Sequence, residues 1–293
     1  NIDLEIPTGK IFGFIGPSGC GKTTTVRLLT GVYEPTAGEV TVFGRRPTKF
    51  NRRTRERIGY LPQVSVLYSD LTVWENINFT ASVYGVDLWR KDRLDELLDF
   101  VELKEDKSKL VRNLSGGMQR RLSLAQTLVH DPELLFLDEP TAGIDPVLRR
   151  KFWDHFKELQ DQGRTLFITT QYVGEAAYCD YVGVMAHGKL VLVDTPEGLR
   201  RRAFGGEVVH LRSRERISYA ELQRLQELPF IKGRISRFNE TGIRLVVEEA
   251  SIAMPEIMEW CKANGITVEA IEEYFPPYDD AFVELVKHET EIK

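Results

Sequence analysis

Apolar runs and alternating patterns predict strands over the first two thirds of the chain. Lys10–Ile15 is almost continuously apolar, which is typical of a strand that is buried on both faces of a parallel sheet. Asn1–Ile6 alternates instead, so Ile2, Leu4 and Ile6 would line one face of a half-buried strand. Further strands are expected at Glu39–Phe43, Arg57–Leu61, Glu133–Leu137, Thr165–Thr170, Tyr181–Ala186 and Lys189–Asp194.

Helical spacing interrupts these strands. A helix is expected at Lys22–Thr30, and a longer helical region lies between Leu61 and Asp131. The apolar residues that recur at helical intervals in that region are Leu94, Leu97, Leu98, Val101, Leu122, Ala125 and Val129. The pattern therefore predicts an α/β core with a helical insertion.

A change in composition near Leu199–Gly206 marks a second domain. We expect a first domain at 1–204 and a small α+β domain at 205–293. Strands at 207–212, 231–238, 242–248 and 266–272 and helices at 218–227, 252–263 and 279–288 are expected in it. The order β-α-β-β-α-β favours a ferredoxin-like fold.

Composition excludes several classes of protein. The 293 residues are 42% hydrophobic and 28% charged, which argues against wholesale disorder. No apolar run approaches the roughly 18 residues that span a bilayer, so the chain cannot form a membrane path alone. The net charge of −5 argues against a general nucleic-acid binder. Cys20, Cys179 and Cys261 form no disulfide framework, which favours a reducing compartment. Because the chain begins at Asn1 inside an expected strand, we expect a further segment upstream.

A glycine-rich turn joins the Lys10–Ile15 strand to the Lys22–Thr30 helix. Gly16-Pro-Ser-Gly-Cys-Gly-Lys22-Thr23 fits G-x-x-x-x-G-K-[ST] in the strand–turn–helix context that this pattern requires. Backbone N–H groups of such a turn and the positive end of the helix dipole hold phosphate. Lys22 would reach the β- and γ-phosphates of ATP, and the Thr23 hydroxyl would ligate Mg²⁺. The residues expected to bind nucleotide here are Gly16, Pro17, Ser18, Gly19, Cys20, Gly21, Lys22, Thr23 and Thr24.

Two carboxylates end the apolar run Leu134–Leu137. Open α/β sheets place ligands at the carboxyl ends of their strands, so Asp138 would hold Mg²⁺ and Glu139 would act as general base for the attacking water. A further helix begins at Ser115, a natural N-cap, and Gly116 and Gly117 allow close approach to an anion. A second anion-binding helix start is explained if ATP lies between two copies of the chain.

Each of these motifs also has a purely structural interpretation. The glycine-rich turn could merely join a strand to a helix, the carboxylates could simply be solvated, and Ser115 could cap an ordinary helix. The Lys22-Thr23 pair in its context makes the first alternative improbable and weakens the second. Cys20 is interpreted as a small residue that fits its position rather than as a redox sensor.

Taken jointly, five motifs resemble the ATPases of ABC transporters. They are Gly16–Thr23, Gln63 after Leu61-Pro62, Leu114–Gln119, Leu134–Pro140 and Ala142–Asp145, in the order and spacing of that family. The resemblance implies a P-loop NTPase core with an antiparallel β-subdomain and a helical subdomain at about 64–130. It also implies a head-to-tail dimer in which each ATP lies between the cradle of one chain and Ser115–Gly117 of the other.

The resemblance also implies individual roles. Gln63 looks like the residue that senses Mg²⁺ and the attacking water, and Asp145 looks like a cross-dimer contact. Gln119 would join the nucleotide-binding set, Thr23, Gln63 and Asp138 would be the metal ligands, and Lys22, Glu139 and Gln171 would be catalytic. The implied cofactors are ATP and Mg²⁺.

Gln171 departs from the family pattern, in which His usually follows the Thr pair. An amide can hydrogen-bond to phosphate but cannot become an imidazolium. Thr170–Ala176 is similar to the daunorubicin-type exporters, where Gln is common, so our hypothesis is retained but slow turnover. An inactive nucleotide-dependent regulator is the alternative. Phe12 and Phe14 are interpreted as core residues, and no residue is assigned to adenine stacking.

Other features support weaker predictions. The basic segment 44–57 could meet anionic lipid or nucleic acid, but a solvated loop is favoured. Tyr68 and Trp74 would either help to form a groove for a membrane partner or lie in the helical core. His130, His155, His187, His210 and His288 show no metal-binding spacing. The C-terminal stretch 269–286 resembles multidrug-exporter ATPases, in which such an extension assists dimer contacts or regulation; a stabilising appendage is the alternative.

These observations predict the ATP-hydrolysing subunit of an ABC transporter, and an exporter of drugs, lipids or other small molecules in particular. Its expected partners are a transmembrane permease and a second ATPase subunit, either another copy or a paired chain. We expect it at the cytoplasmic face of the cell membrane, held there by the permease, and we do not expect it to bind nucleic acid. A soluble ABC-type ATPase acting on nucleic acid or ribosomes is the alternative.

Overall fold

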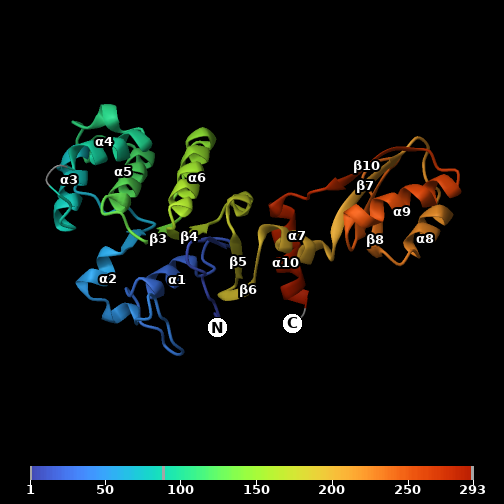
Figure 1. Ribbon diagram of the computed structural model, residues 1–293, viewed down its shortest axis with the longest axis horizontal. Coiled ribbons are helices and arrows are strands. Elements are labelled where there is room, and N and C mark those ends of the chain that lie inside the picture. The colour runs from blue at the N-terminus through green and yellow to red at the C-terminus, as the bar shows by residue number, and fades with distance from the viewer. Residues whose placement is uncertain (1, 88–89, 292–293) are drawn as a thin grey trace. The chain divides into compact units, whose positions relative to one another are not determined.

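Two compact units make up the chain. The computed structural model describes residues 2–87 and 90–291, with side chains up to residue 287 (Figure 1). Contacts divide it into a first unit, 1–193, and a second unit, 194–293. The sequence predicted a boundary between 204 and 205, whereas this division falls before the helix α7 (Pro196–Phe204).

A six-stranded sheet forms the centre of the first unit. Its order is β2-β3-β4-β1-β5-β6, and every pair up to β5 is parallel. The strands are β1 (Ile11–Ile15), β2 (Ile58–Leu61), β3 (Leu134–Asp138), β4 (Thr165–Thr170), β5 (Tyr181–Ala186) and β6 (Lys189–Asp194). Thr169 of β4 pairs with Phe14 on one side and Asp138 on the other, so the carboxyl ends of β1, β3 and β4 meet at one edge. That edge is where the predicted motifs converge.

Aromatic side chains pack on this sheet. Phe12 and Phe14 are completely buried, which confirms them as core residues. Phe167 stacks on Phe12 with ring centroids 5.7 Å apart and lies 5.4 Å from Phe14. The ring of Phe136 lies 6.0 Å from that of Phe167. Burial of these four phenylalanines supplies a large hydrophobic stabilisation of the sheet.

The first unit also contains helices, and three of them form what is called the helical group below. The helices are α1 (Lys22–Leu29), α2 (Arg52–Glu56), α3 (Val73–Val83), α4 (Lys91–Phe100), α5 (Gly116–Leu128) and α6 (Pro146–Asp161). In Figure 1, the members of the helical group, α3, α4 and α5, gather together, and α6 stands beside them. Thr72 and Glu75 form a reciprocal capping box that starts α3. The three grouped helices lie within the segment that was expected to be helical.

The helix α6 was not predicted, although its sequence carries clear signals. Asp145 caps it by accepting hydrogen bonds from the backbone N–H groups of Val147 and Leu148, both at 3.1 Å. Pro146 occupies its first turn, where no intrahelical N–H is needed. Its buried face consists of Leu148, Phe152, Trp153, Phe156 and Gln160.

Two predicted strands are not formed, and these predictions were wrong. Residues 2–7 carry no strand, although Leu4 and Ile6 do pack against the aromatic core; Asn1 lies outside the described residues. At Glu39–Phe43 a single bridge joins Val42 to Arg45 around a turn in which Phe43 and Gly44 have positive φ. Leu4 and Ile6 are partly buried and Val42 is buried, whereas Ile2 is exposed. Without a neighbouring strand, the backbone groups of both segments have no ladder to join. An antiparallel β-subdomain is therefore not seen in this part of the described chain.

The second unit contains a four-stranded antiparallel sheet of order β10-β7-β9-β8. Its strands are β7 (Glu207–Ser213), β8 (Ile231–Arg237), β9 (Gly242–Val247) and β10 (Val268–Tyr274). Its helices besides α7 are α8 (Tyr219–Gln226), α9 (Ala250–Ala263) and α10 (Tyr278–Glu291). From β7 to β10 the elements follow the order β-α-β-β-α-β; the assignment to the ferredoxin-like family stays a prediction. Val209, Leu211, Leu245, Ile257 and Cys261 belong to its buried core.

Candidate functional site

The turn between β1 and α1 is shaped by glycine at two positions. A side chain at Gly16 would place its Cβ 2.3 Å from the backbone oxygen of Met185, so no other residue fits without displacing β5. Gly21 has φ of 112° and precedes the first helical residue. The turn therefore wraps around the start of α1 as a phosphate-binding loop does.

Lys22 lies inside this turn and is only 4% exposed. Its Nζ donates hydrogen bonds to the backbone oxygens of Gly16, at 2.7 Å, and Pro17, at 3.1 Å. The same Nζ lies 3.7 Å from Oε1 of Glu139, whose side chain is 11% exposed. The structure thus brings together two residues that the sequence predicted to be catalytic.

Glu139 adopts a backbone conformation that side chains rarely take, with φ of 53°. Its N–H is held by Thr169, through the backbone oxygen at 3.0 Å and the hydroxyl at 3.1 Å. Strain of this kind persists only where the surrounding structure enforces it, and it gathers at functional sites. The positive φ of Glu139 directs its carboxylate away from β3 and toward Lys22.

Asp138 is completely buried at the end of β3. Its Oδ1 accepts a hydrogen bond from the Thr169 hydroxyl, whereas its Oδ2 is buried and has no hydrogen-bond partner in the described chain. A buried carboxylate oxygen left without a partner is costly, and a hard cation or its water would satisfy it. Asp138 therefore fits Mg²⁺, whereas the role of Thr23 as a second ligand stays a prediction. Gln63 has an exposed side chain, so its role as a ligand stays a prediction.

Gln171, the residue after β4, contacts the turn between β1 and α1. Its Oε1 accepts a hydrogen bond from the Ser18 hydroxyl at 3.1 Å. The backbone oxygen of the preceding Thr170 accepts from Gly16 N–H at 3.4 Å. The residue that departs from the family pattern therefore lies at the site.

Sequence reasoning missed Arg120, which is 6% exposed. Its Nη1 donates to the backbone oxygens of Pro62 and Gln63, the latter at 3.1 Å. Its Nη2 donates to the backbone oxygens of Asp138 and Glu139, the latter at 3.0 Å. Burial lowers the pKa of Arg120 from its ordinary value, although Asp138 and Glu139 oppose the shift. Because all four acceptors are backbone groups, no side-chain motif could have indicated this role.

In the part of the chain that the structure describes, the hydrogen bonds of Ser115 and Gln119 stay within their own segment and do not reach the phosphate-binding turn. The Ser115 hydroxyl accepts from Met118 N–H at 3.2 Å and caps α5. Gln119 is turned toward its own segment and donates to the backbone oxygens of Val111 and Leu114, both at 3.3 Å. Over the described residues, no hydrogen bond or ion pair joins Ser115–Gly117 to Gly16–Thr23. A Cβ at Gly116 would meet no atom within 4 Å, so nothing within the chain requires glycine there.

Asp145 caps α6, and a network of side chains centred on buried Glu175 lies on the segments around it. Glu175 is 3% exposed and accepts a hydrogen bond from the Thr141 hydroxyl at 2.7 Å. Arg149 of α6 lies 3.8 Å from the same Glu175 oxygen, and its guanidinium stacks over the ring of Tyr172 at 4.3 Å. The segment that begins at Thr141 is thereby tied to the one that follows Gln171. Whether Asp145 also contacts a second copy stays a prediction.

The basic segment 44–57 is partly neutralised by its surroundings. Ion pairs join Arg46 to Glu39, at 3.3 Å, and Arg52 to Glu56, at 2.7 Å. Arg57 pairs with Glu133 at 2.7 Å, and this pair raises the pKa of Arg57 and lowers that of Glu133. The arginines are exposed as expected, but residues 52–56 form the helix α2 rather than a loop.

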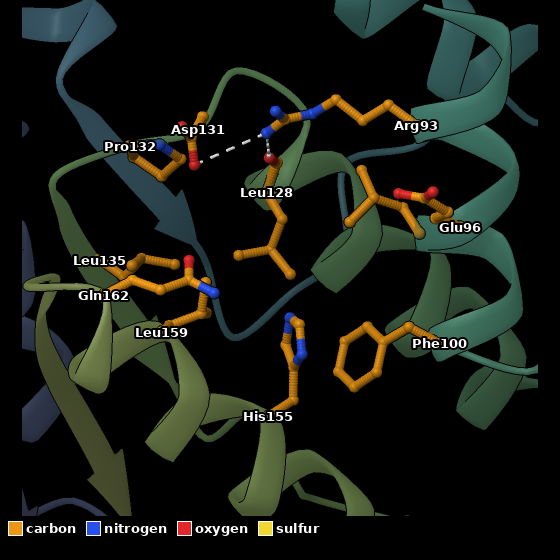
Figure 2. A pocket seen from close by; sticks show the side chains of 11 residues that line it. Arg93, Glu96, Phe100, Leu128, Asp131, Pro132, Leu135, His155, Leu159 and Gln162 are labelled. Carbon is orange, nitrogen blue, oxygen red and sulfur yellow. Dashed lines mark hydrogen bonds and ion pairs between the residues drawn. The ribbon is translucent and has the colours of Figure 1, made fainter.

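A cavity of about 260 Å³ lies away from this site (Figure 2). Leu135 and Pro132 line it at the amino end of β3, opposite to Asp138. Figure 2 shows Arg93 reaching toward Asp131 and the Leu128 oxygen, which it contacts at 3.7 and 3.1 Å. Arg93, Asp131 and His155 of its lining already take part in ion pairs, so the turn between β1 and α1 remains the better candidate.

Comparison with known proteins gives a consistent result. Residues 1–142 match the family model described as ABC transporter. The chain is 38% identical over 226 residues to the daunorubicin/doxorubicin resistance ATP-binding protein DrrA of Streptomyces peucetius, which covers 76% of this chain and 68% of DrrA. It is 36% identical over 208 residues to the probable multidrug ABC transporter ATP-binding protein YbhF of Escherichia coli, covering 71% of this chain. The aligned region is 36% of YbhF, so the chain spans about a third of that relative.

The fold has solved counterparts. A structure described as the ATP binding subunit of an ABC transporter superposes with a TM-score of 0.63 and 27% sequence identity. The superposition covers 69% of this chain and 85% of that one. Over the described residues, no helix is long and apolar enough to cross a membrane.

Proposed function

The chain belongs to the ABC transporter family, and from this premise we propose that it binds and hydrolyses ATP to drive export through a membrane partner. The observation that carries the proposal is the convergence of Lys22, Asp138, Glu139 and Gln171 where β1, β3 and β4 end. One bound nucleotide would then face all four of these side chains. They would bind its phosphates, hold its metal ion, act as the general base and contact its γ-phosphate, respectively.

Each residue has a task that follows from its geometry. Lys22 would exchange the oxygens of Gly16 and Pro17 for those of the β- and γ-phosphates. Asp138 and Thr23 would hold Mg²⁺, which supplies charge neutralisation at the transferring phosphoryl group when bound. Glu139 would accept the proton of the attacking water as the bond to the leaving phosphate oxygen breaks. Gln171 would donate its amide N–H to the γ-phosphate while Ser18 holds its oxygen.

A second copy of the chain would complete the site. Gly116 and Gly117 lie at the exposed start of α5, where a side chain at Gly116 would meet only open space. The backbone N–H groups there could approach a phosphate held by another chain. ATP would thereby close a head-to-tail dimer, and hydrolysis would reopen it.

The permease partner would bind beside Gln63. Val64, Val66, Tyr68 and Phe79 are 76, 79, 54 and 43% exposed, and Tyr68 packs edge-on against Phe79 at 5.0 Å. Exposed apolar side chains gathered in this way mark an interaction surface. DrrA and YbhF are named for drug resistance and multidrug transport, so we propose a drug-like or lipid-like cargo and a location at the cytoplasmic face of the membrane.

Nucleotide binding and dimer formation test the proposal. Glu139→Gln should bind MgATP and form a stable dimer by light scattering, because the nucleotide is held but not consumed. Lys22→Ala should lose most ATP affinity. Gly116→Ala in the Glu139→Gln background should bind ATP but remain monomeric, whereas Gly174→Ala, a matched glycine with equally open space, should still dimerise. Unchanged ATP affinity in Lys22→Ala, or dimers in the Gly116→Ala variant, would contradict it.

A further inference from the structure

We propose that Arg120 is a positioning residue that holds the Gln63 loop in a fixed place relative to Glu139, and that hydrolysis depends on this connection. The proposal rests on the proposed function. It concerns Arg120, which directly follows the motif Leu114–Gln119 and is not itself part of the motifs that carry the family resemblance.

The contacts of Arg120 join segments that are far apart in sequence. One terminal nitrogen donates to Pro62 and Gln63, 58 and 57 residues earlier, and the other to Asp138 and Glu139, 18 and 19 residues later. Three of the four acceptors are carbonyls of Gln63, Asp138 and Glu139, which are proposed to act on the metal ion and the attacking water. A displacement of Arg120 would therefore move those residues relative to one another.

The chemistry of the guanidinium suits this task. Its planar fork presents two terminal nitrogens in fixed directions, so one side chain can hold two pairs of carbonyls at once. A lysine ammonium is a single point donor and could hold only one pair well. A buried charge is costly unless it is hydrogen-bonded, so the four carbonyls and the arginine require one another.

The place of Arg120 on α5 adds a second connection. It lies five residues after Ser115, on the helix whose amino end is proposed to meet the ATP of another copy. Gln63 begins the exposed apolar segment proposed to meet the permease. Arg120 thus lies on α5 and contacts both the Gln63 loop and the residues at the end of β3, three parts that must act together. This explains why a charged group is buried at this position.

Arg121 provides a matched control. It neighbours Arg120 on α5 and also donates to two backbone oxygens, of Val101 at 2.9 Å and of Glu102 at 3.2 Å. Those oxygens belong to the helical group and not to the site. Removing Arg121 should therefore cost stability without affecting the chemical step.

Kinetics of the full chain test the proposal. In Arg120→Gln we expect kcat for ATP hydrolysis to fall about 10- to 100-fold, because catalytic groups misplaced by about 1 Å lose up to 10²-fold, while the Kd for ATP stays unchanged. Arg120→Lys should lie between Arg120→Gln and the parent. Arg121→Gln should keep the parental kcat. In a Glu139→Gln background, Arg120→Gln should add little further loss, because both changes remove the same function.

Backbone hydrogen exchange gives a readout that does not need turnover. Arg120→Gln should speed exchange at residues 61–66 and 138–142 of the nucleotide-free chain, and Arg121→Gln should not. If the parent fails to hydrolyse ATP but this exchange pattern appears, the proposed function is wrong and the connection stands. Parental kcat in folded Arg120→Gln, equal losses in Arg121→Gln, or unchanged exchange at both segments would overturn the proposal.

Discussion

Two neighbouring acids at the end of β3 are suited to different tasks because their backbones differ. Asp138 continues the strand and is completely buried, with one carboxylate oxygen left without a partner. Glu139 has positive φ, and its side chain leaves the strand toward Lys22. This difference supports the proposed roles, in which Asp138 holds a cation and Glu139 reaches the attacking water.

Replacing Gln171 tests whether an amide serves in place of the usual histidine. Gln171→Ala should lower kcat about tenfold, because the loss of one hydrogen bond costs about 1.4 kcal/mol. Gln171→His should restore activity to at least the parental rate. Gln162→Ala, a change of the same size at an exposed position after α6, serves as the control in the same steady-state assay. An unaffected Gln171→Ala enzyme would show that this residue does not contact the phosphate.

Most residues placed at the site could be predicted because they belong to motifs with defined spacing. Lys22, Asp138 and Glu139 need only a strand, a turn and the knowledge that parallel strands end at one edge. Gln171 was predicted from the family resemblance instead. Arg120 could not be predicted in this way, because it binds backbone oxygens whose proximity exists only in the folded chain.

At the scale of elements, the presence of a neighbouring strand decided which predicted strands formed. β1, β4 and β5 have sheet neighbours on both sides, and their continuous apolar runs placed them to within a residue. The segment at Glu39–Phe43 has a similar alternation but only one bridge, since nothing lies beside it to extend the ladder. A hydrophobic pattern reports which side chains are buried, and pairing requires a partner that the local sequence does not contain.

The helical group is joined to β2 through His130, which gives its stability a dependence on pH. His130 stacks on Tyr84 at 3.7 Å and contacts the Ile58 oxygen at 3.0 Å. Burial lowers the pKa of His130 below its ordinary 6.5, and the Ile58 oxygen and Asp131 oppose this shift only partly.

The sign of the dependence follows from which state binds more protons. Below about pH 6.5 the unfolded chain protonates His130 while the folded chain still does not, so the free energy of unfolding falls as the pH drops. His130→Gln should remove a slope of at most about 1.4 kcal/mol per pH unit, measured by urea denaturation between pH 7.5 and 5.5. His187→Gln, in an exposed turn, is the control. Equal slopes in the parent and His130→Gln would refute this assignment.

At the scale of the molecule, the two units carry separate cores. The first contains every residue proposed to act on ATP, and the second has its own sheet and buried cluster. The division before α7 predicts that the first unit ends at residue 193. A role of the second unit in dimer contacts or regulation remains a prediction from its resemblance to exporter ATPases.

The most direct test of the central claim is steady-state ATP hydrolysis by the purified chain with Mg²⁺. Glu139→Gln is compared with the parent and with Glu105→Gln, the same chemical change at an exposed position on the short helix Lys104–Asp106. The parent and Glu105→Gln should hydrolyse ATP at equal rates, and Glu139→Gln should be slower by about 10²-fold or more, as expected on removal of a general base. Hydrolysis by Glu139→Gln at the parental rate, or no hydrolysis by the parent, would contradict the account.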